Sequence, residues 1–437
     1  MTATLTLFEH ESKPFCWTDR DLVIFERLRG TLNVDVLRPT IRNAKREIQA
    51  AQYVGVVRLG HRTVQILPKM YRANEAVPEQ QRAQEATRNL LHLLAYAGQL
   101  PIREHEIAPL VRRDSDWFEI LTRLFASHLM EEWQRGASRN YQTVEAELPV
   151  LKGTWRITEQ LRRPERKHLF AVAYDEFTAD NPINRVFRYV VERLWHLTRD
   201  ANNRRLLGDL RQWMDEVALL PSVTAADASP TLLTRLNQRY APLLNLARLF
   251  LDGGALQLAA DDLTTFAFVF DMNQLFEAFI ANFIRRHRDE ILPPALQRCD
   301  MLVQSRGATC FLAHTNGKPV FQLRPDIAFR DSTEFPLLID TKYKRLNAAD
   351  TTLGVSQDDF YQMHAYAHRY HCPRVLLLYP QTAGMAAPLQ THFGLVSHDT
   401  VISVATIDVR VDLQNAADRY MLIERLRSLF HKEQEDG

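Results

Sequence analysis

The pattern of apolar and polar positions divides the chain into a front part of strands and helices, a helical middle part and a back part in which both alternate. In the front part, Tyr53–Leu59 and Arg62–Leu67 are short β-rich runs separated by Gly60 and His61. A two-residue loop that opens with glycine suits a tight hairpin, and Pro68 ends the second run. Leucines and aromatic residues at three- and four-residue spacing then predict helices over residues 85–97 and 117–134, followed by extended segments over 141–148 and 169–174.

The middle part changes to helix at Pro182. Proline is favoured in the first turn of a helix, and Asp180 or Asn181 is placed to cap that turn. An apolar stripe follows at helical spacing, made of Ile183, Val186, Phe187, Val190 and Leu194. Further helix is predicted over residues 204–219 and 230–250. The glycine pair at 253–254 and the polar turn around Asp261 then indicate a boundary.

The back part alternates between helices and strands. Helices are predicted over residues 266–287, 357–370 and 417–431, and extended segments around Cys310 and over 321–329, 336–343, 374–379, 392–396 and 401–409. This order is typical of an α/β fold with a central mixed sheet flanked by helices. We therefore divide the chain into a mixed α+β region (1–180), a helical connector (181–260) and an α/β domain (261–437).

Composition narrows the class of protein. Hydrophobic residues make up 46% and charged residues 24%, as in ordinary globular proteins. We find neither an apolar run of membrane-spanning length nor a signal peptide. Four cysteines without a CxxC pair argue against structural zinc or a disulfide framework, so a cytoplasmic location is expected.

The net charge of the chain is only +1. A protein that binds DNA alone usually carries a basic excess, because neutralisation of phosphates supplies most of the non-specific affinity. Any DNA-facing surface of this chain must therefore be local, or a partner must hold the DNA. The basic clusters at 162–167 and 285–288 are either such surfaces or ordinary solvated faces.

Two carboxylates and a lysine at strand ends are the strongest candidates for chemistry. Asp326 follows Pro325 after one apolar run, and Asp340 and Lys342 lie at the end of the next. Alternation along a strand points Asp340 and Lys342 to the same face, and open α/β sheets bind ligands outside such strand ends. Hydrolysis of a phosphodiester needs an oriented water and neutralised charge, which Mg²⁺ supplies when carboxylate and carbonyl oxygens hold it.

We therefore predict a magnesium site with Asp326, Asp340 and the backbone carbonyl of Thr341 as ligands. Lys342 would orient the attacking water or stabilise charge on the phosphate. The alternative is a surface ion pair between Asp340 and Lys342. The Pro-Asp pair on the preceding run and the helix that follows favour the site.

Two predicted helices add further candidates. Glu277 borders the apolar stripe of the 266–287 helix, where it is either a third acid that reaches the metal through water or a solvent-edge residue paired with a neighbour. Gln362 and Tyr366 share a face of the 357–370 helix. They either contact DNA or position the lysine, or they form a stabilising pair beside the core. Three nearby histidines are weaker candidates, because magnesium chemistry does not call for imidazole: His364, His368 and His371.

These residues together resemble a known family. The pattern Arg324-Pro325-Asp326 followed by Ile339-Asp340-Thr341-Lys342-Tyr343-Lys344 resembles the PD-(D/E)xK nuclease core of the McrC family, the nuclease subunit of the McrBC modification-dependent (5-methylcytosine) restriction system. Other matching segments are 271–277, 361–366, 53–60, 66–69 and 174–185. The resemblance runs from about residue 53 to 380. The nuclease motif alone would indicate only a large superfamily, and the front segments make the match more specific.

The resemblance implies a PD-(D/E)xK, restriction-endonuclease-like domain in the last segment and a partner-docking role for the first. It implies that Asp326, Asp340 and Lys342 are the catalytic core, with Glu277 as the helix acid and Gln362 and Tyr366 as accessory residues. It also implies Mg²⁺, or Mn²⁺ in its place, and double-stranded DNA as substrate. The implied partner is an AAA+ GTPase ring of the McrB type that recognises methylated DNA and that this chain stimulates.

The leading hypothesis is therefore a magnesium-dependent DNA endonuclease subunit that is controlled by its ring partner. We find no GxxxxGK[ST] motif, so nucleotide binding is expected of the ring and not of this chain. Two alternatives remain: a structural adaptor that activates the GTPase, and a nuclease that acts alone. Arg58, Arg62 and Lys69 are weak candidates for ring contacts, with loop solubility as the alternative for each. The first fifty residues and the tail after about residue 400 have no counterpart in the resemblance.

Overall fold

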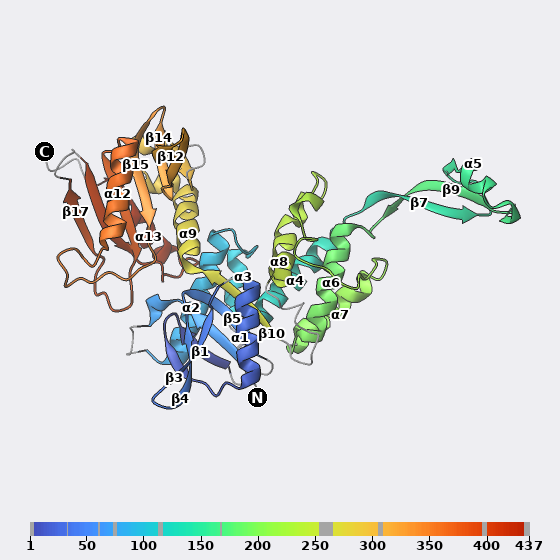
Figure 1. Ribbon diagram of the computed structural model, residues 1–437, viewed down its shortest axis with the longest axis horizontal. Helices are drawn as coiled ribbons and strands as arrows, with labels where there is room; N and C mark the ends of the chain where they lie inside the picture. The colour runs from blue at the N-terminus through green and yellow to red at the C-terminus, as the bar shows by residue number, and fades with distance from the viewer. Residues whose placement is uncertain are drawn as a thin grey trace. The chain divides into compact units, whose positions relative to one another are not determined.

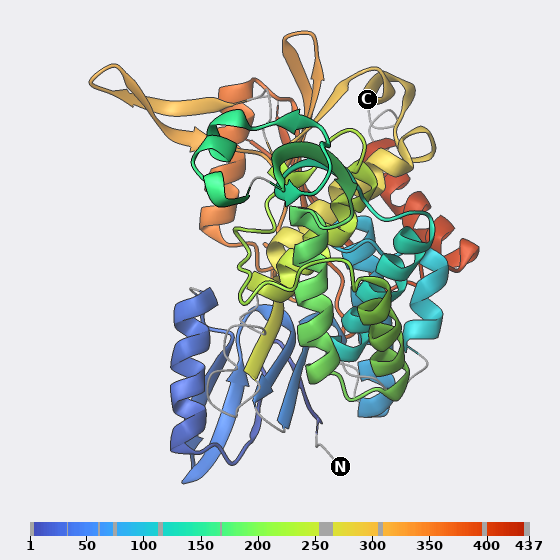
Figure 2. The ribbon, with the colours of Figure 1, turned by 90° about the vertical axis from the view of Figure 1, so that its right-hand side faces the viewer.

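The computed structural model describes residues 4–32, 34–59, 62–72, 77–111, 117–166, 168–252, 265–304, 309–395 and 400–431. The chain forms two compact units, one made of Met1–Asp114 with Val269–Gly437 and the other of Ser115–Phe268. The sequence pattern predicted three consecutive segments instead. The difference arises because the chain leaves the first unit after its front region and returns through β10 (Thr265–Asp271), which joins the front sheet beside β5 (Tyr53–Leu59). Figure 2 shows β10 in yellow beside the blue strands.

Among its described residues, the front region of the first unit contains two sheets and three helices. One sheet has the strand order β1-β6-β5-β10 and the other β2-β4-β3. The predicted hairpin is confirmed, since β5 and β6 pair antiparallel from Gly55 opposite Ile66 to Leu59 opposite Arg62, while Gly60 and His61 lie outside the described residues. The remaining elements are β1 (Thr4–Phe8), β2 (Ser12–Pro14), α1 (Asp19–Leu32), β3 (Leu37–Arg42), β4 (Lys45–Ala50), β6 (Arg62–Leu67), the 3₁₀ turn η1 (Lys69–Tyr71), α2 (Glu79–Tyr96) and α3 (Glu104–Val111).

The second unit consists of helices and a long strand ribbon (Figure 1). Its helices are α4 (Trp117–Gln134), α6 (Pro182–Leu197), α7 (Ala201–Trp213) and α8 (Ala241–Asp252). The ribbon, which we call the arm, consists of β7 (Asn140–Leu148), β8 (Thr154–Trp155), α5 (Ile157–Leu161), η2 (Pro164–Arg166) and β9 (Phe170–Thr178). The prediction of a helix over 230–250 was wrong in its first half, where the turns η3 (Pro230–Leu232) and η4 (Gln238–Tyr240) precede α8. Pro242 disfavours helix immediately before it and is tolerated only in a first turn.

The back region of the first unit forms the predicted α/β arrangement. Its mixed six-stranded sheet has the order β11-β14-β15-β16-β18-β17, in which β15, β16 and β18 are parallel to one another. Its elements are α9 (Met272–Arg286), α10 (Arg288–Ile291), α11 (Pro294–Gln297), β11 (Asp300–Val303), β12 (Cys310–Thr315), β13 (Lys318–Leu323), β14 (Ile327–Asp331), β15 (Glu334–Thr341), α12 (Gln357–Tyr370), β16 (Arg374–Pro380), β17 (Gln390–Gly394), β18 (Val401–Ile407) and α13 (Ala416–His431).

Helices cover both faces of this sheet. Ala328 of β14 shares a buried cluster with Met363 of α12. The next residue, Phe329, contacts Phe430 of α13 with ring centroids 6.4 Å apart. Because successive side chains of a strand point to opposite faces, α12 and α13 lie on opposite sides. Among the helices of the described residues, none combines the length and the apolarity that crossing a membrane requires.

Two predictions in the back region were wrong. Residues 266–287 form strand β10 and then helix α9, not one helix, because Asp271 ends the strand and caps the helix by accepting a hydrogen bond from the Asn273 amide. Residues 321–329 form two strands, not one. The chain breaks at residues 324–326, so that β13 pairs with β12 and β14 pairs with β15.

Candidate active site

Strand pairing brings the two aspartates together. Ile327 of β14 lies opposite Ile339 of β15, so Asp326 and Asp340 occupy neighbouring places at the same end of the sheet. Oδ2 of Asp326 accepts hydrogen bonds from the backbone amide of Thr341 at 2.7 Å and from its hydroxyl at 2.8 Å. These two bonds fix the Asp326 carboxylate against the strand that carries Asp340.

Lys342 is held at the same place by three contacts. Its amide donates to the carbonyl of Leu378 at 2.9 Å, which extends the pairing of β15 and β16 beyond the last strand residue. Its Nζ lies 2.7 Å from Oδ2 of Asp340 and donates to Oε1 of Gln362 at 2.8 Å. Gln362 in turn donates from Nε2 to the hydroxyl of Tyr366 at 3.0 Å. The helix α12 therefore orients the lysine through Gln362 and Tyr366, one of the arrangements that the sequence left open.

Burial raises the pKa values of the acidic groups here. Burial, and then the charge of Asp326, raise the pKa of Asp340 to about 7, although Lys342 acts in the opposite direction. Burial raises the pKa of Asp326 against the hydrogen bonds from Thr341. Burial, followed by the charge of Asp326, also raises the pKa of Glu277 on α9. The three carboxyl groups are thus electrostatically linked, and a cation between them would favour their ionised forms.

The residues present fit a hard divalent cation. The contacts described above use Oδ2 of both Asp326 and Asp340, and Oδ2 of Asp340 is buried and accepts no hydrogen bond from the described residues beyond its ion pair with Lys342. No cluster of three or more His, Cys, Asp or Glu side chains that could hold a metal occurs within the part of the chain that the structure describes. A cation would therefore rely on two carboxylates, a backbone oxygen and water, which is a ligand set that Mg²⁺ accepts. Glu277 is near, but it does not complete a three-carboxylate cluster.

Arginines of both basic clusters make contacts within the chain, and one of the three histidines ends a helix. In the arm, Arg163 and Arg166 both pair with Glu147. After α9, Arg288 donates to backbone carbonyls, including that of Gln297 at 2.7 Å. His371 adopts a left-handed conformation and ends α12. These contacts give Arg163, Arg166 and Arg288 a role in folding.

A buried polar network that the sequence did not reveal lies next to the strand end. Glu9, which follows β1, accepts hydrogen bonds at Oε2 from the Lys69 amide at 2.9 Å and from the Tyr343 hydroxyl at 2.8 Å. Lys69 donates from Nζ to the carbonyl of Tyr343 at 2.8 Å and lies over its ring. Tyr343 directly follows Lys342, so the front region supports the candidate site. Glu9 is 334 residues from Tyr343 in sequence, and no local pattern connects them.

The weak candidates for ring contacts are instead tied into the first unit. Lys69 belongs to this network, and Arg58 is only 4% exposed. Arg62 forms an ion pair with Asp21 at 2.6 Å. These contacts give Lys69 and Arg62 a role within the first unit, and a role of Arg58, Arg62 or Lys69 in binding the ring stays a prediction.

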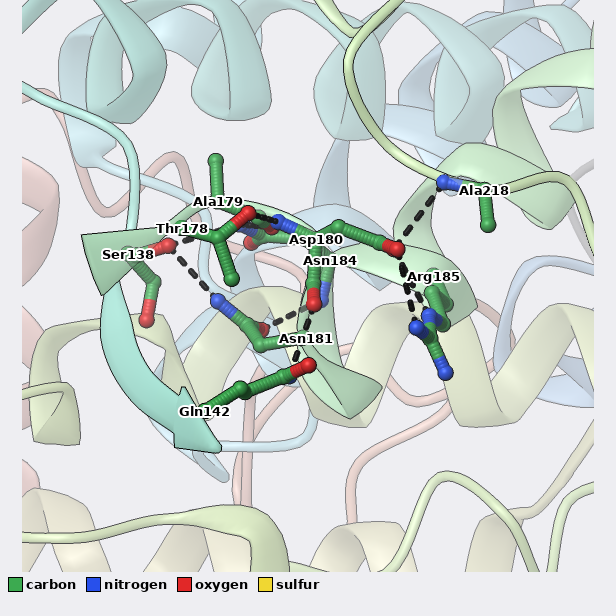
Figure 3. Close-up of polar contacts among 9 residues, drawn as sticks. All are labelled: Ser138, Gln142, Thr178, Ala179, Asp180, Asn181, Asn184, Arg185 and Ala218. Atoms are coloured by element: carbon green, nitrogen blue, oxygen red, sulfur yellow. Dashed lines mark hydrogen bonds and ion pairs between the residues drawn. The ribbon is translucent and has the colours of Figure 1, made fainter. Parts of the chain in front are cut away.

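The segment 174–185 anchors the arm. Asn181 and Asn184 both donate from their side chains to the carbonyl of Ser138, at 2.7 and 2.8 Å. Asp180 accepts two hydrogen bonds from Arg185, at 2.7 and 2.8 Å, and one from the amide of Ala218 at 3.0 Å (Figure 3). Asn181 also caps α6, as predicted. These residues therefore fix the direction in which the arm leaves α6.

The arm exposes large apolar side chains of the types that folded domains usually bury. Leu161 is 76% exposed and Tyr141 is 72% exposed, and others of the arm share this exposure: Val150, Leu151, Trp155, Ile157 and Phe177. Gly153 shapes the end of the arm, because it has a φ of +70° and a Cβ there would lie 2.4 Å from the carbonyl oxygen of Ala173. Exposed apolar surface of this kind is typical of a protein interaction site.

Comparison with known proteins gives a consistent result. The sequence profile described as McrBC 5-methylcytosine restriction system component matches residues 48–380. A chain in the structure of the tetradecameric assembly of Thermococcus gammatolerans McrB AAA+ hexamers with bound McrC is similar over 98% of this chain and 100% of its own, with 23% identity and a TM-score of 0.73. A chain of the T. gammatolerans McrBC complex is similar over 65% of this chain and 88% of its own, with 26% identity and a TM-score of 0.52. No curated protein matches.

Proposed function

Because the chain belongs to the family of McrBC 5-methylcytosine restriction system components, we propose that it is a magnesium-dependent DNA endonuclease subunit with a PD-(D/E)xK domain. It acts while docked on an AAA+ GTPase ring of the McrB type that recognises methylated DNA, and it stimulates that GTPase. The observation that carries the proposal is the convergence of Asp326, Asp340 and Lys342 at one strand end, with Lys342 held by α12.

Each residue has a distinct part in the proposed reaction. Asp326, Asp340 and the Thr341 carbonyl hold Mg²⁺ or Mn²⁺, with Glu277 acting through water. The ion supplies a water of lowered pKa and neutralises charge on the scissile phosphate. Lys342 keeps its ammonium beside the carboxylates and stabilises negative charge that develops on the phosphate. Because Gln362 holds Nζ from the other side, the ammonium is already placed before the substrate binds.

The proposed partner follows from the related structures and from the arm. Both similar structures are of complexes that include McrB or McrBC. In this chain, the arm lies within the region 1–180 that we expect to dock, and its exposed apolar side chains suit a protein partner. A ring that recognises and holds the DNA also explains a nuclease chain with a net charge of only +1.

The function is tested by reconstitution with the ring. We expect cleavage of methylated DNA only when the chain, the ring, GTP and Mg²⁺ are all present, together with faster GTP hydrolysis by the ring. Faster GTP hydrolysis without cleavage would instead support the structural adaptor. Magnesium-dependent cleavage without the ring would support the nuclease that acts alone.

Leu161→Asp is expected to weaken association with the ring at least tenfold, roughly the cost of losing one central apolar contact. The charge would enter an apolar interface and lose its hydration there. The measurement is the dissociation constant from surface-immobilised ring. Leu236→Asp is the matched control, because Leu236 is 94% exposed, lies in the same unit and is outside the arm. Equal affinity of the two variants would contradict docking through the arm.

A further inference from the structure

The hairpin of β12 and β13 is anchored to the helix that orients Lys342. Arg369 of α12 donates from Nε to the carbonyl of Phe311 at 3.0 Å, and Tyr370 donates from its hydroxyl to the carbonyl of Leu323 at 3.3 Å. The chain then passes through residues 324–325 directly to Asp326. The two hydrogen bonds to α12 and the short link to Asp326 therefore fix the base of the hairpin relative to the candidate site.

One pair of residues on this hairpin is exposed and irregular. The register runs from Phe311 opposite Gln322 to Ala313 opposite Val320, which places Leu312 across from Phe321. Leu312 is 52% exposed and Phe321 is 73% exposed.

Phe321 has a φ of 56°, a left-handed conformation that is strained for a bulky aromatic residue. No ring contact within the described residues accounts for this conformation. Strained residues of this kind persist only where the surrounding structure holds them in place. They cluster at active sites and ligand-binding sites.

The charge of the hairpin identifies the kind of ligand. Residues 309–325 contain no Asp or Glu, although the whole chain carries 53 acidic residues against 54 basic ones. Lys318 and Arg324 are both exposed there. An exposed apolar pair on a hairpin free of acidic residues, with Lys318 and Arg324 on the same hairpin and a candidate phosphodiesterase site next to it, suits duplex DNA.

We propose, on the basis of the nuclease function proposed above, that this hairpin binds the minor groove of the substrate duplex, with Phe321 and Leu312 as an apolar wedge between base steps. Wedges of this kind unstack a base step and bend the duplex. The bend would bring the neighbouring phosphate to Asp326 and Asp340. Lys318 and Arg324 would contact the phosphates on either side of the wedge.

The test uses Phe321→Gly in the full chain with its ring partner, with Ca²⁺ in place of Mg²⁺ so that the DNA stays intact. We expect affinity for a fluorescein-labelled duplex to fall about tenfold, and the fluorescence rise of a 2-aminopurine placed in the duplex to disappear. The thermal midpoint of the variant should equal or exceed that of the wild type, because glycine adopts a φ of 56° without strain. If the variant binds the duplex more weakly but is equally stable, the loss of affinity does not come from a loss of folding.

Tyr420→Ala is the matched control, because Tyr420 is a 59% exposed aromatic residue on α13, outside the hairpin. Unchanged duplex affinity and unchanged 2-aminopurine fluorescence in Phe321→Gly would overturn the wedge and leave the nuclease assignment standing. The same would follow if Phe321→Gly lost only self-association in analytical ultracentrifugation. Failure of the wild-type chain and ring to bind any duplex would contradict the wedge and the proposed function together.

Discussion

We expect Asp340→Asn to lower the rate of the proposed DNA cleavage at least about a thousandfold and to leave the chain folded. The substitution removes a charged oxygen ligand of the proposed magnesium site and the anionic partner of the Lys342 ammonium. Because asparagine has nearly the size of aspartate and keeps an oxygen that accepts from the Lys342 ammonium, we expect the variant to fold. The measurement is the initial rate of cleavage of methylated plasmid by the reconstituted complex.

Asp331→Asn is the matched control, because Asp331 ends β14 and is exposed. It should cleave at the wild-type rate. Lys342→Ala should be as inactive as Asp340→Asn and should still stimulate the ring GTPase, since neither residue belongs to the arm. Cleavage by a folded Asp340→Asn, Lys342→Ala double variant at the wild-type rate would refute the assignment of the site.

We expect Glu9→Gln to raise the free energy of unfolding above pH 7 by roughly 3 kcal/mol, the value that follows from the pKa shift of Glu9 between the folded and unfolded chain. Burial raises the pKa of Glu9 from 4.5 to about 7, so the folded chain holds a proton that the unfolded chain releases. The contribution of Glu9 to stability is therefore fully present below pH 4.5 and is lost as the pH rises through 7. The glutamine side chain does not ionise, and the variant should lack this loss. Urea unfolding at pH values from about 5 to 8 measures the difference.

Two further variants locate the effect. Glu9→Ala should be destabilised at every pH, because the Lys69 amide and the Tyr343 hydroxyl lose their acceptor. Glu79→Gln should leave the pH dependence unchanged, since Glu79 pairs with Lys13 at the surface with 53% of its side chain exposed. If Glu9→Gln and the wild type lose stability in parallel as the pH rises, the buried carboxyl does not titrate as we infer.

Local sequence patterns correctly predicted the helices whose ends are determined by residues within or next to them. Helix α12 begins and ends as predicted, because Ser356 caps its first turn and His371 ends it in a left-handed conformation. Asn181 and Pro182 likewise define the start of α6. The family membership inferred from short motifs was confirmed over residues 48–380.

Other elements depended on partners distant in sequence. The apolar run after Thr265 forms strand β10, because the free edge of β5 in the front sheet offers backbone groups with which it forms hydrogen bonds. The first fifty residues, which no motif explained, supply Glu9 and the strand β1 of that sheet. The boundary expected around residues 253–261 lies outside the described residues.

The sequence by itself determined the chemistry available to this protein: two carboxylates and a lysine at strand ends, spaced so that strand alternation puts Asp340 and Lys342 on one face. Only the tertiary structure decided how they are held. Gln362 reaches Lys342 because α12 packs on the same face of the sheet, and Glu9 reaches Tyr343 because the front region packs beside the strand end. Spacing along a strand is a local property of the backbone. Contacts between residues far apart in sequence arise only when apolar faces are buried together.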